Sequence, residues 1–170
     1  TVIVNTTGPT IQASSGTFTF TGTDIDYSGK AIILKSCDYQ VDTTIGASET
    51  LKIGDSSCKL EAVTINNTGT LDLTNSGAGN YNVEIGGTFT HNTGGTFTGG
   101  SGTVTMNGTS KNIAGTAPAT TFNNLTIGGT ITLQKAATVT STLTVSGTYS
   151  LSLDAVILSI GPSGTITSTG

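Results

Sequence analysis

The chain alternates short runs of apolar and polar residues, and this alternation returns at intervals of roughly 15–21 residues. It is clearest in six triplets that have an apolar residue at each end and a polar residue between. A repeat of this length holds two or three strands but cannot bury an apolar face alone, so successive repeats must stack. The triplets are residues 63–65, 83–85, 104–106, 125–127, 143–145 and 158–160.

This stacking predicts an all-β fold, a right-handed parallel β-solenoid with rungs of about 18–21 residues. Clusters of Gly and Asn between the runs supply turns, and no stretch has the length and period of an amphipathic helix. We expect one β domain over residues 1–170, with an irregular, charge-bearing part over 1–61 and a repeat-bearing part over 62–170. The alternative fold is an antiparallel β-sandwich that exchanges a donor strand with its neighbour.

Thr-x-Thr triplets, such as residues 103–105, 130–132 and 165–167, are abundant. Alternate residues of a strand point to opposite faces, so stacked triplets predict outer hydroxyl ladders over an inner apolar column. Regular ladders of this kind are how some solenoid proteins bind ice. Ice matching requires equal rungs, and the uneven spacing of the repeat argues against it.

Composition favours an extracellular polymer over a cytoplasmic monomer. Only 9% of the residues are charged, against roughly a quarter in average proteins, and the surface is therefore rich in hydroxyl groups. The net charge of -4 and the absence of Arg exclude binding to a phosphate backbone. No apolar stretch is long enough to span a membrane. The chain begins at Thr1 without Met, which is expected after removal of a signal peptide or excision from a longer chain.

Most of the charged residues lie between Asp24 and Glu61. We interpret this section as a solvated edge of the domain; a partner-facing or calcium-binding surface is the alternative. Asp24 and Asp26 share one strand face and are candidate Ca²⁺ ligands together with Asp38 or Asp42. Because paired acids on a strand more often form a plain polar face, we expect no metal site and no cofactor.

The two cysteines are Cys37 and Cys58, and the spacing between them equals the commonest repeat length further along the chain. If this section winds with the same period, they occupy equivalent positions on successive rungs, about 4.8 Å apart. That separation suits a disulfide, and a disulfide implies an oxidising compartment. The alternatives are two buried thiols or bridges to other subunits.

Catalytic chemistry is not predicted. His91 lies next to a Gly-rich turn without a recognisable Ser, Asp or Cys partner, and we expect it to be a surface turn residue rather than a catalytic base. A polysaccharide-active enzyme is therefore the least favoured function. Four Asn-x-Ser/Thr sequons are glycosylation candidates if the chain is secreted: Asn5, Asn66, Asn107 and Asn124.

Residues 87–97, 102–109 and 121–127 resemble the Thr/Gly/Asn-rich repeat arrays of large secreted microbial surface proteins. They are more distantly similar to the β-helix passengers of filamentous adhesins and autotransporters. The resemblance covers roughly residues 83–150. It implies a cell-surface location and a structural or adhesive role, and it brings no catalytic residues.

Both ends of the chain read as strands without a cap. The end rungs of a stacked sheet expose unpaired backbone groups, and head-to-tail contacts that do not close generate fibres. We therefore expect the subunit of an extracellular filament, sheath or similar assembly that associates with itself. An adhesive or carbohydrate-binding module with surface glycans as partners is the alternative. The expected interface residues are Val2, Ile3, Val4, Ile157, Leu158, Ile160 and Ile166.

Overall fold

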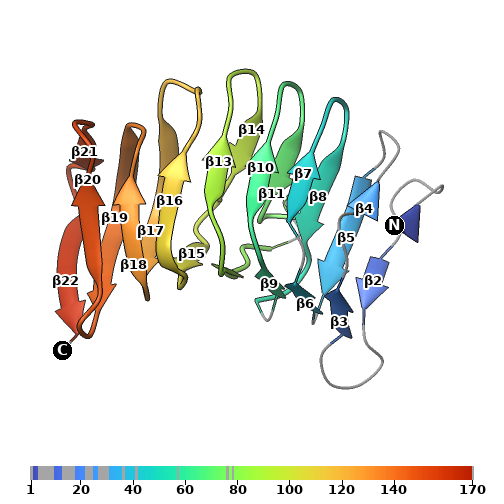
Figure 1. The fold of residues 1–170 in the computed structure, drawn as a ribbon, viewed down its shortest axis with the longest axis horizontal. Helices are drawn as coiled ribbons and strands as arrows, with labels where there is room; N and C mark the ends of the chain where they lie inside the picture. The colour runs from blue at the N-terminus through green and yellow to red at the C-terminus, as the bar shows by residue number, and fades with distance from the viewer. Residues whose placement is uncertain are drawn as a thin grey trace.

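The computed structural model describes residues 2–3, 10–12, 18–21, 25–26, 31–35, 37–40, 42–56, 58–75, 77 and 79–169; within residues 2–32, and at 37, 39 and 40, only the backbone is described. All regular structure in these ranges is β-strand, and every strand pairing is parallel. The strands wind into a β-solenoid of about 6 turns (Figure 1). The predicted solenoid is confirmed, and the antiparallel sandwich is wrong.

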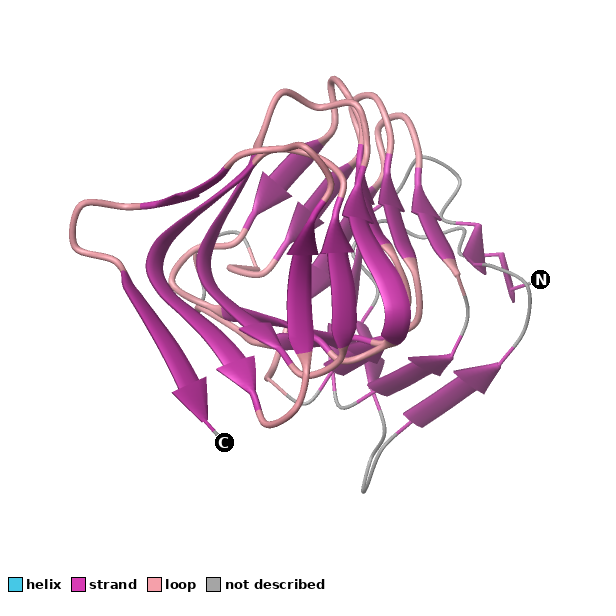
Figure 2. Cartoon of the chain, turned by 60° about the vertical axis from the view of Figure 1, so that its left-hand side comes forward, coloured by secondary structure: helices cyan, strands magenta, loops and turns pink. Residues whose placement is uncertain are grey.

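Successive turns place their strands side by side in parallel sheets around a common axis (Figure 2). The six-stranded sheet contains β7 (Thr43–Ile45), β10 (Val63–Ile65), β13 (Phe89–His91), β16 (Thr109–Ala114), β18 (Thr130–Leu133) and β20 (Ser150–Leu153). The five-stranded sheet contains β2 (Thr10–Gln12), β5 (Ala31–Lys35), β8 (Thr50–Ile53), β11 (Thr70–Asp72) and β14 (Thr96–Thr98).

The nine-stranded sheet runs the length of the solenoid. Its long strand β19 carries two partners, because β21 pairs with its first part and β22 with its second. A separate pair is formed by β1 (Val2–Ile3) and β4 (Ile25–Asp26). The nine strands are β3 (Phe18–Thr21), β6 (Cys37–Gln40), β9 (Cys58–Leu60), β12 (Val83–Ile85), β15 (Thr103–Met106), β17 (Thr120–Ile127), β19 (Ala137–Ser146), β21 (Leu158–Ile160) and β22 (Thr165–Thr169).

The core is a stack of inward-facing apolar side chains. Val83, Val104, Leu125 and Leu143 are paired in register on four successive strands, and each is at most 3% exposed. On each of these strands, the residue that follows the buried one faces outward and is partly exposed. The period-two alternation of the sequence thus divides each strand into an inner and an outer set, as predicted.

The stacking corrects the sequence repeat. Triplets 83–85, 104–106, 125–127 and 143–145 do lie on one another, but 63–65 belongs to the six-stranded sheet and 158–160 pairs with 137–139. The shortest turn leads from Thr120 to Ala137, and one of the longest leads from Val63 to Phe89. The predicted range of rung lengths was too narrow because the segments between the strands vary in length. One of the longer segments forms hydrogen-bonded turns after Thr74.

At one corner of the solenoid, residues with left-handed backbone and Asn side chains recur from one turn of the solenoid to the next. Ser48, Thr68 and Gly94 precede equivalent strand positions and all have left-handed backbone, with φ of 64°, 60° and 81°. At the same corner, the Asn92 side-chain amide donates a 2.9 Å hydrogen bond to Oδ1 of Asn66 on the turn before. The corner residues therefore stack in register like the strands.

Three aromatic rings fill the core where the five-stranded sheet ends. Phe97 of β14, Phe89 of β13 and Phe122 of β17 have ring centroids 5.5 to 5.7 Å apart, in tilted or edge-on arrangements. The first part of β17 therefore closes the side of the core that β14 closes in the preceding turn of the solenoid. Phe89 and Phe122 are fully buried.

Replacing Phe122 by Ala is expected to lower the free energy of unfolding by about 3–5 kcal/mol, because it leaves a cavity between two other rings. Chemical denaturation followed by circular dichroism measures this change. The matched control is Thr121→Ala at the exposed neighbouring position, which should change stability by less than about 1 kcal/mol. Equal losses in the two variants would contradict the assigned core position.

Candidate functional site

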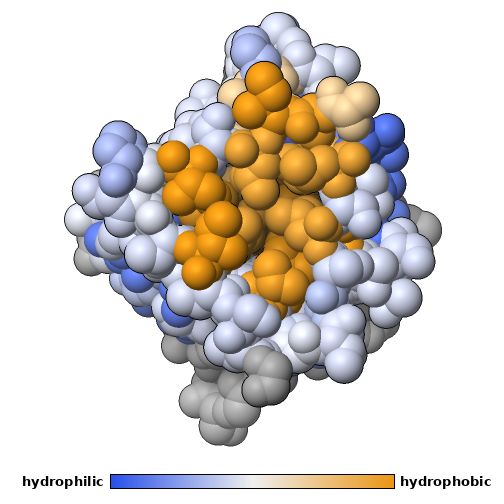
Figure 3. Space-filling view, turned by 90° about the vertical axis from the view of Figure 1, so that its left-hand side faces the viewer, coloured by the Kyte–Doolittle hydropathy of each residue, from blue (hydrophilic) through white to orange (hydrophobic). Residues whose placement is uncertain are grey.

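The solenoid core is open at its C-terminal end. Ile166 continues the column of Val104, Leu125 and Leu143 in register; it lies on the last described strand, and its exposed fraction is 66%. Leu153 likewise follows the buried Leu133 in register and is 52% exposed. Figure 3 shows the resulting apolar patch at this end of the molecule.

The patch is bordered by strand edges. β20 and β21 are the last strands of their sheets, and β22 pairs with β19 alone among the described strands. Their outer N–H and C=O groups are therefore available to a further strand. The end of the solenoid combines uncovered apolar side chains with unpaired backbone.

The structure brings four of the seven predicted interface residues to this end. Ile157 is 71% exposed, Ile166 ends the core column, and Leu158 and Ile160 are partly buried against the core. Val2 and Ile3 form β1, whose side chains are not described, and Val4 lies outside the described residues. Sequence reasoning missed the exposed Tyr149 and Leu153, although the alternation over residues 151–153 marks a strand there.

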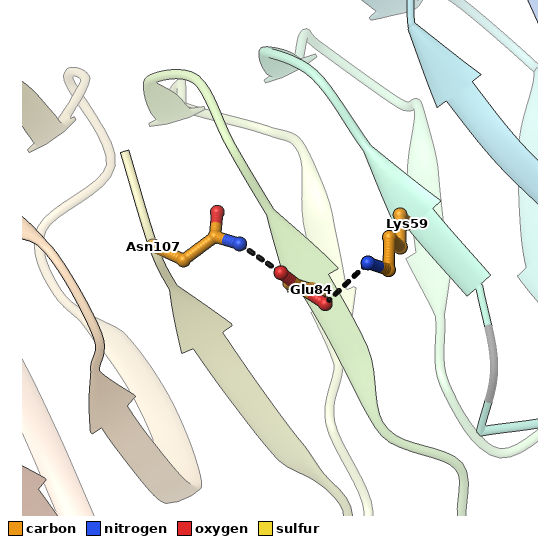
Figure 4. Close-up of polar contacts among 3 residues, drawn as sticks. All are labelled: Lys59, Glu84 and Asn107. Carbon is orange, nitrogen blue, oxygen red and sulfur yellow. Dashed lines mark hydrogen bonds and ion pairs between the residues drawn. The ribbon is translucent and has the colours of Figure 1, made fainter. Parts of the chain in front are cut away.

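A polar ridge crosses the outer face of the nine-stranded sheet (Figure 4). Lys59 of β9 and Glu84 of β12 form an ion pair with an Nζ–Oε2 distance of 3.4 Å, and the Asn107 side chain donates a hydrogen bond to Oε1 of Glu84. Lys59 is 56% exposed, so the ion pair adds about 1 kcal/mol or less to stability. Sequence analysis missed this ridge because only the stacking of turns joins its residues.

Two shallow cavities flank the polar ridge, with volumes of about 350 and 260 Å³. Gly86 lines the smaller one, where a Cβ atom would lie 3.1 Å from Oε2 of Glu61. Carboxylate, amide and ammonium groups line the walls. The larger cavity is lined by Ser56, Cys58, Lys59, Asn82, Val83, Glu84 and Thr105, and the smaller by Asp38, Lys59, Leu60, Glu61, Glu84, Gly86 and Asn107.

The acidic residues considered as calcium ligands do not form a metal site in the described part of the chain. No group of three or more His, Cys, Asp or Glu side chains that could hold a metal ion occurs there. Asp42 is exposed, and its Oδ1 accepts a 3.4 Å hydrogen bond from the backbone of Ala62. Asp24 lies outside the described residues, and only the backbone of Asp26 is described.

The two cysteines lie on adjacent turns, as their spacing predicts. β6 and β9 pair Asp38 with Lys59 and Tyr39 with Leu60, so Cys37 and Cys58 precede equivalent positions. Cys58 is buried, and its Sγ lies 3.7 Å from Oδ1 of Asp55. The Cys37 side chain lies outside the described residues, and no disulfide is found among those described. The disulfide stays a prediction.

The sequons differ in accessibility. Asn107 is exposed after β15, and Asn66 is partly exposed at a corner. Asn124 lies within β17, where its side-chain nitrogen donates a 3.1 Å hydrogen bond to the carbonyl of Ser101. A glycan would have to replace that hydrogen bond. Asn5 lies outside the described residues, and glycosylation stays a prediction at all four positions.

His91 is not a surface turn residue, contrary to the sequence interpretation. It occupies an inward position of β13 and is 8% exposed. Thr120 and Lys135, which are 0% and 4% exposed, join it in a buried polar cluster. The adjacent Gly-rich turn suggested exposure, but the alternation that places Phe89 inside also places His91 inside.

The donor and acceptor of each hydrogen bond in this cluster can be assigned. The Nε2 atom of His91 lies 3.0 Å from the carbonyl oxygen of Gly95, which can only accept, so Nε2 carries the proton. Nδ1 of the neutral ring then accepts from the Thr120 hydroxyl at 3.0 Å, and that hydroxyl accepts from Nζ of Lys135 at 2.7 Å. Every polar group of the cluster thus has a partner with His91 neutral.

Burial disfavours positive charge in this cluster. It lowers the pKa of His91 below 6.5; the hydrogen bond to Gly95 opposes this change and the charge of Lys135 reinforces it. Burial also lowers the pKa of Lys135 from 10.5 to about 8. We interpret the cluster as a structural element that fills the core beyond the five-stranded sheet, because its polar groups hydrogen-bond to one another and to the backbone.

The cluster predicts a specific pH dependence of stability. Because the pKa of Lys135 is lower in the folded protein, the free energy of unfolding should rise between pH 8 and 10.5. It should fall as the pH drops below 6.5, where unfolding lets His91 bind a proton. Lys135→Met should remove the alkaline rise and increase stability at neutral pH, as measured by thermal unfolding. Lys111→Met is the control, and an alkaline rise that survives in Lys135→Met would contradict the assignment.

The cysteine placement predicts that Cys37 and Cys58 are both protected from alkylation in the denatured, unreduced protein. Mass spectrometry after alkylation measures this. Reduction should lower the free energy of unfolding by roughly 3 kcal/mol, as expected for a closed loop of this length. A Cys37→Ser, Cys58→Ser double variant should be insensitive to reductant. Modification of both thiols without reduction would show that the disulfide is absent.

No helix in the described part of the chain is long and apolar enough to cross a membrane. No family model, curated protein or solved structure matches the chain.

Proposed function

We propose that this chain is a structural subunit of an extracellular assembly at a cell surface, such as a filament or sheath, in which copies add end to end. The observation that carries this proposal is the uncovered core of the last turn. Ile166 and Leu153 occupy core positions yet are more than half exposed. Burying one such side chain stabilises an association by about 1.5–3 kcal/mol.

A second copy fits this end because of the direction of the strands. β2 and β3 are the first strands of the five- and nine-stranded sheets, while β20 and β21 are the last strands of the six- and nine-stranded sheets. Stacking the first turn of one copy on the last turn of another would continue the parallel pairing. Such a contact joins two different surfaces, and when it repeats along the solenoid axis without closing it generates a filament.

The surface chemistry supports an extracellular setting. Few residues are charged, and the outward strand positions of the C-terminal turns carry mostly Thr, Ser and Asn. A disulfide between Cys37 and Cys58, if formed, requires an oxidising compartment. The resemblance to secreted microbial repeat arrays points to the same location.

An adhesive, carbohydrate-binding role is the second candidate, favoured by the polar ridge. Its two cavities present carboxylate, amide and hydroxyl groups, which hydrogen-bond to sugar hydroxyls. Sugar sites commonly add an aromatic ring as a stacking platform. Phe89 and Phe122 are buried in the core, so neither supplies one, and end-to-end assembly remains the favoured function.

Assembly is tested by placing a charge on the open core. Ile166→Glu should leave the fold intact, because the side chain is exposed, but should abolish end-to-end association. Analytical ultracentrifugation and electron microscopy of the full chain should show oligomers or filaments that are lost in this variant. Thr64→Glu, on the side of the six-stranded sheet, is the control and should assemble normally. A wild-type chain that stays monomeric at every concentration would refute the proposal.

A further inference from the structure

Two columns of polar side chains follow the outer face of the nine-stranded sheet from β15 to β22. Both lie on strand positions whose side chains point away from the core and are partly or fully exposed. We call this surface the threonine face. Its columns are Thr103, Asn124, Thr142 and Thr165, and Thr105, Thr126, Thr144 and Thr167.

The register of these columns is uninterrupted. Thr105 pairs with Thr126, Thr126 with Thr144, and Thr144 with Thr167. The single register shift between β17 and β19 falls at residues 122–124, at the start of the threonine face. The number of residues in each turn of the solenoid varies, but the segments between the strands absorb the difference. Strand separation therefore stays constant at about 4.8 Å, and unequal sequence spacing does not argue against a regular array.

The array is ordered in two dimensions. Along each strand its members are two residues apart, or about 6.6 Å, and across the strands they are about 4.8 Å apart. The hydroxyls of Thr144 and Thr167 are hydrogen-bonded at 3.0 Å, and the Thr165 hydroxyl donates to that of Thr142 at 3.4 Å. Because the side chain of Thr is branched at Cβ, it has few rotamers, and these hydrogen bonds restrict it further.

No charged residue interrupts the threonine face. The strands β15, β17, β19 and β22 contain none, and the last charged residue of the polar ridge is Glu84 on the preceding strand. The other two sheets differ: β16 has a register shift next to Lys111, and the outer positions of the five-stranded sheet include Lys52. The threonine face is thus the most regular uncharged surface among the described strands.

We propose that the threonine face binds ice. An ice crystal surface likewise presents water oxygens in evenly spaced parallel rows, which a regular array of hydroxyls in two dimensions can contact repeatedly. Hydroxyls and methyl groups held at fixed positions can hold water in an ice-like arrangement before contact, so little ordering remains to be done on binding. A sugar polymer is less well suited, because the threonine face presents no outward aromatic ring; the one aromatic residue of its strands, Phe122, is buried.

The test measures partition of the purified full chain into slowly growing ice, together with inhibition of ice recrystallisation. The wild-type chain should be enriched in the ice and should inhibit recrystallisation. Thr126→Tyr and Thr144→Tyr each place a bulky ring in the middle of the array and should abolish both activities. Thr64→Tyr, on the outer side of β10, is the matched control and should retain them. Unchanged thermal unfolding shows that each variant is folded, and Thr126→Lys, which adds a hydrated charge without a ring, gives a second probe of the surface.

Two results would overturn the proposal: exclusion of the wild-type chain from ice, or full activity in both Thr126→Tyr and Thr144→Tyr. The Ile166→Glu variant separates this proposal from end-to-end assembly. If ice binding depends on the threonine face alone, monomers of this variant should still enter ice, even though they no longer assemble.

Discussion

The whole structure depends on the burial of each turn by its two neighbours. In the column Val104, Leu125 and Leu143, every side chain is nearly inaccessible because one strand lies above it and another below. The next member, Ile166, lacks the second neighbour and is mostly exposed. A globular core closes on itself, whereas this core extends along one axis and ends only where turns stop being added. The last described turn consequently leaves core positions such as Leu153 and Ile166 exposed.

The same stacking determines the outer surface. When the inner side chains of successive strands lie in register, the outer ones must do so as well, since both belong to the same strands. Lys59 and Glu84 meet for this reason, and so do Thr144 and Thr167. Polar groups that are far apart in the sequence therefore form continuous rows. The shape of each row follows from the packing of the core beneath it.

The sequence predicted the strands and their inner and outer faces, because alternation is a local property. It predicted less well which triplets stack on one another. Residues 63–65 and 158–160 show the alternating pattern but do not stack on the other four triplets, because the turns of the solenoid vary in length and alternation alone does not identify the sheet to which a strand belongs. His91 was placed outside for a similar reason, because its partners Thr120 and Lys135 come from later turns. The open end was predicted in part, since Ile157 and Ile166 follow the strand pattern to the end of the chain.

The proposed end-to-end assembly and the proposed ice binding would use perpendicular surfaces and are therefore compatible. On β22, Ile166 points into the open core while Thr165 and Thr167 point outward, so a turn added by a second copy covers the first and leaves the other two exposed. Each added copy would present another threonine face. If those faces share one side of the assembly, an ice surface meets several of them at once. The effective concentration of the second and later contacts would then be high, so an array that binds weakly as a monomer would bind more tightly as part of a filament.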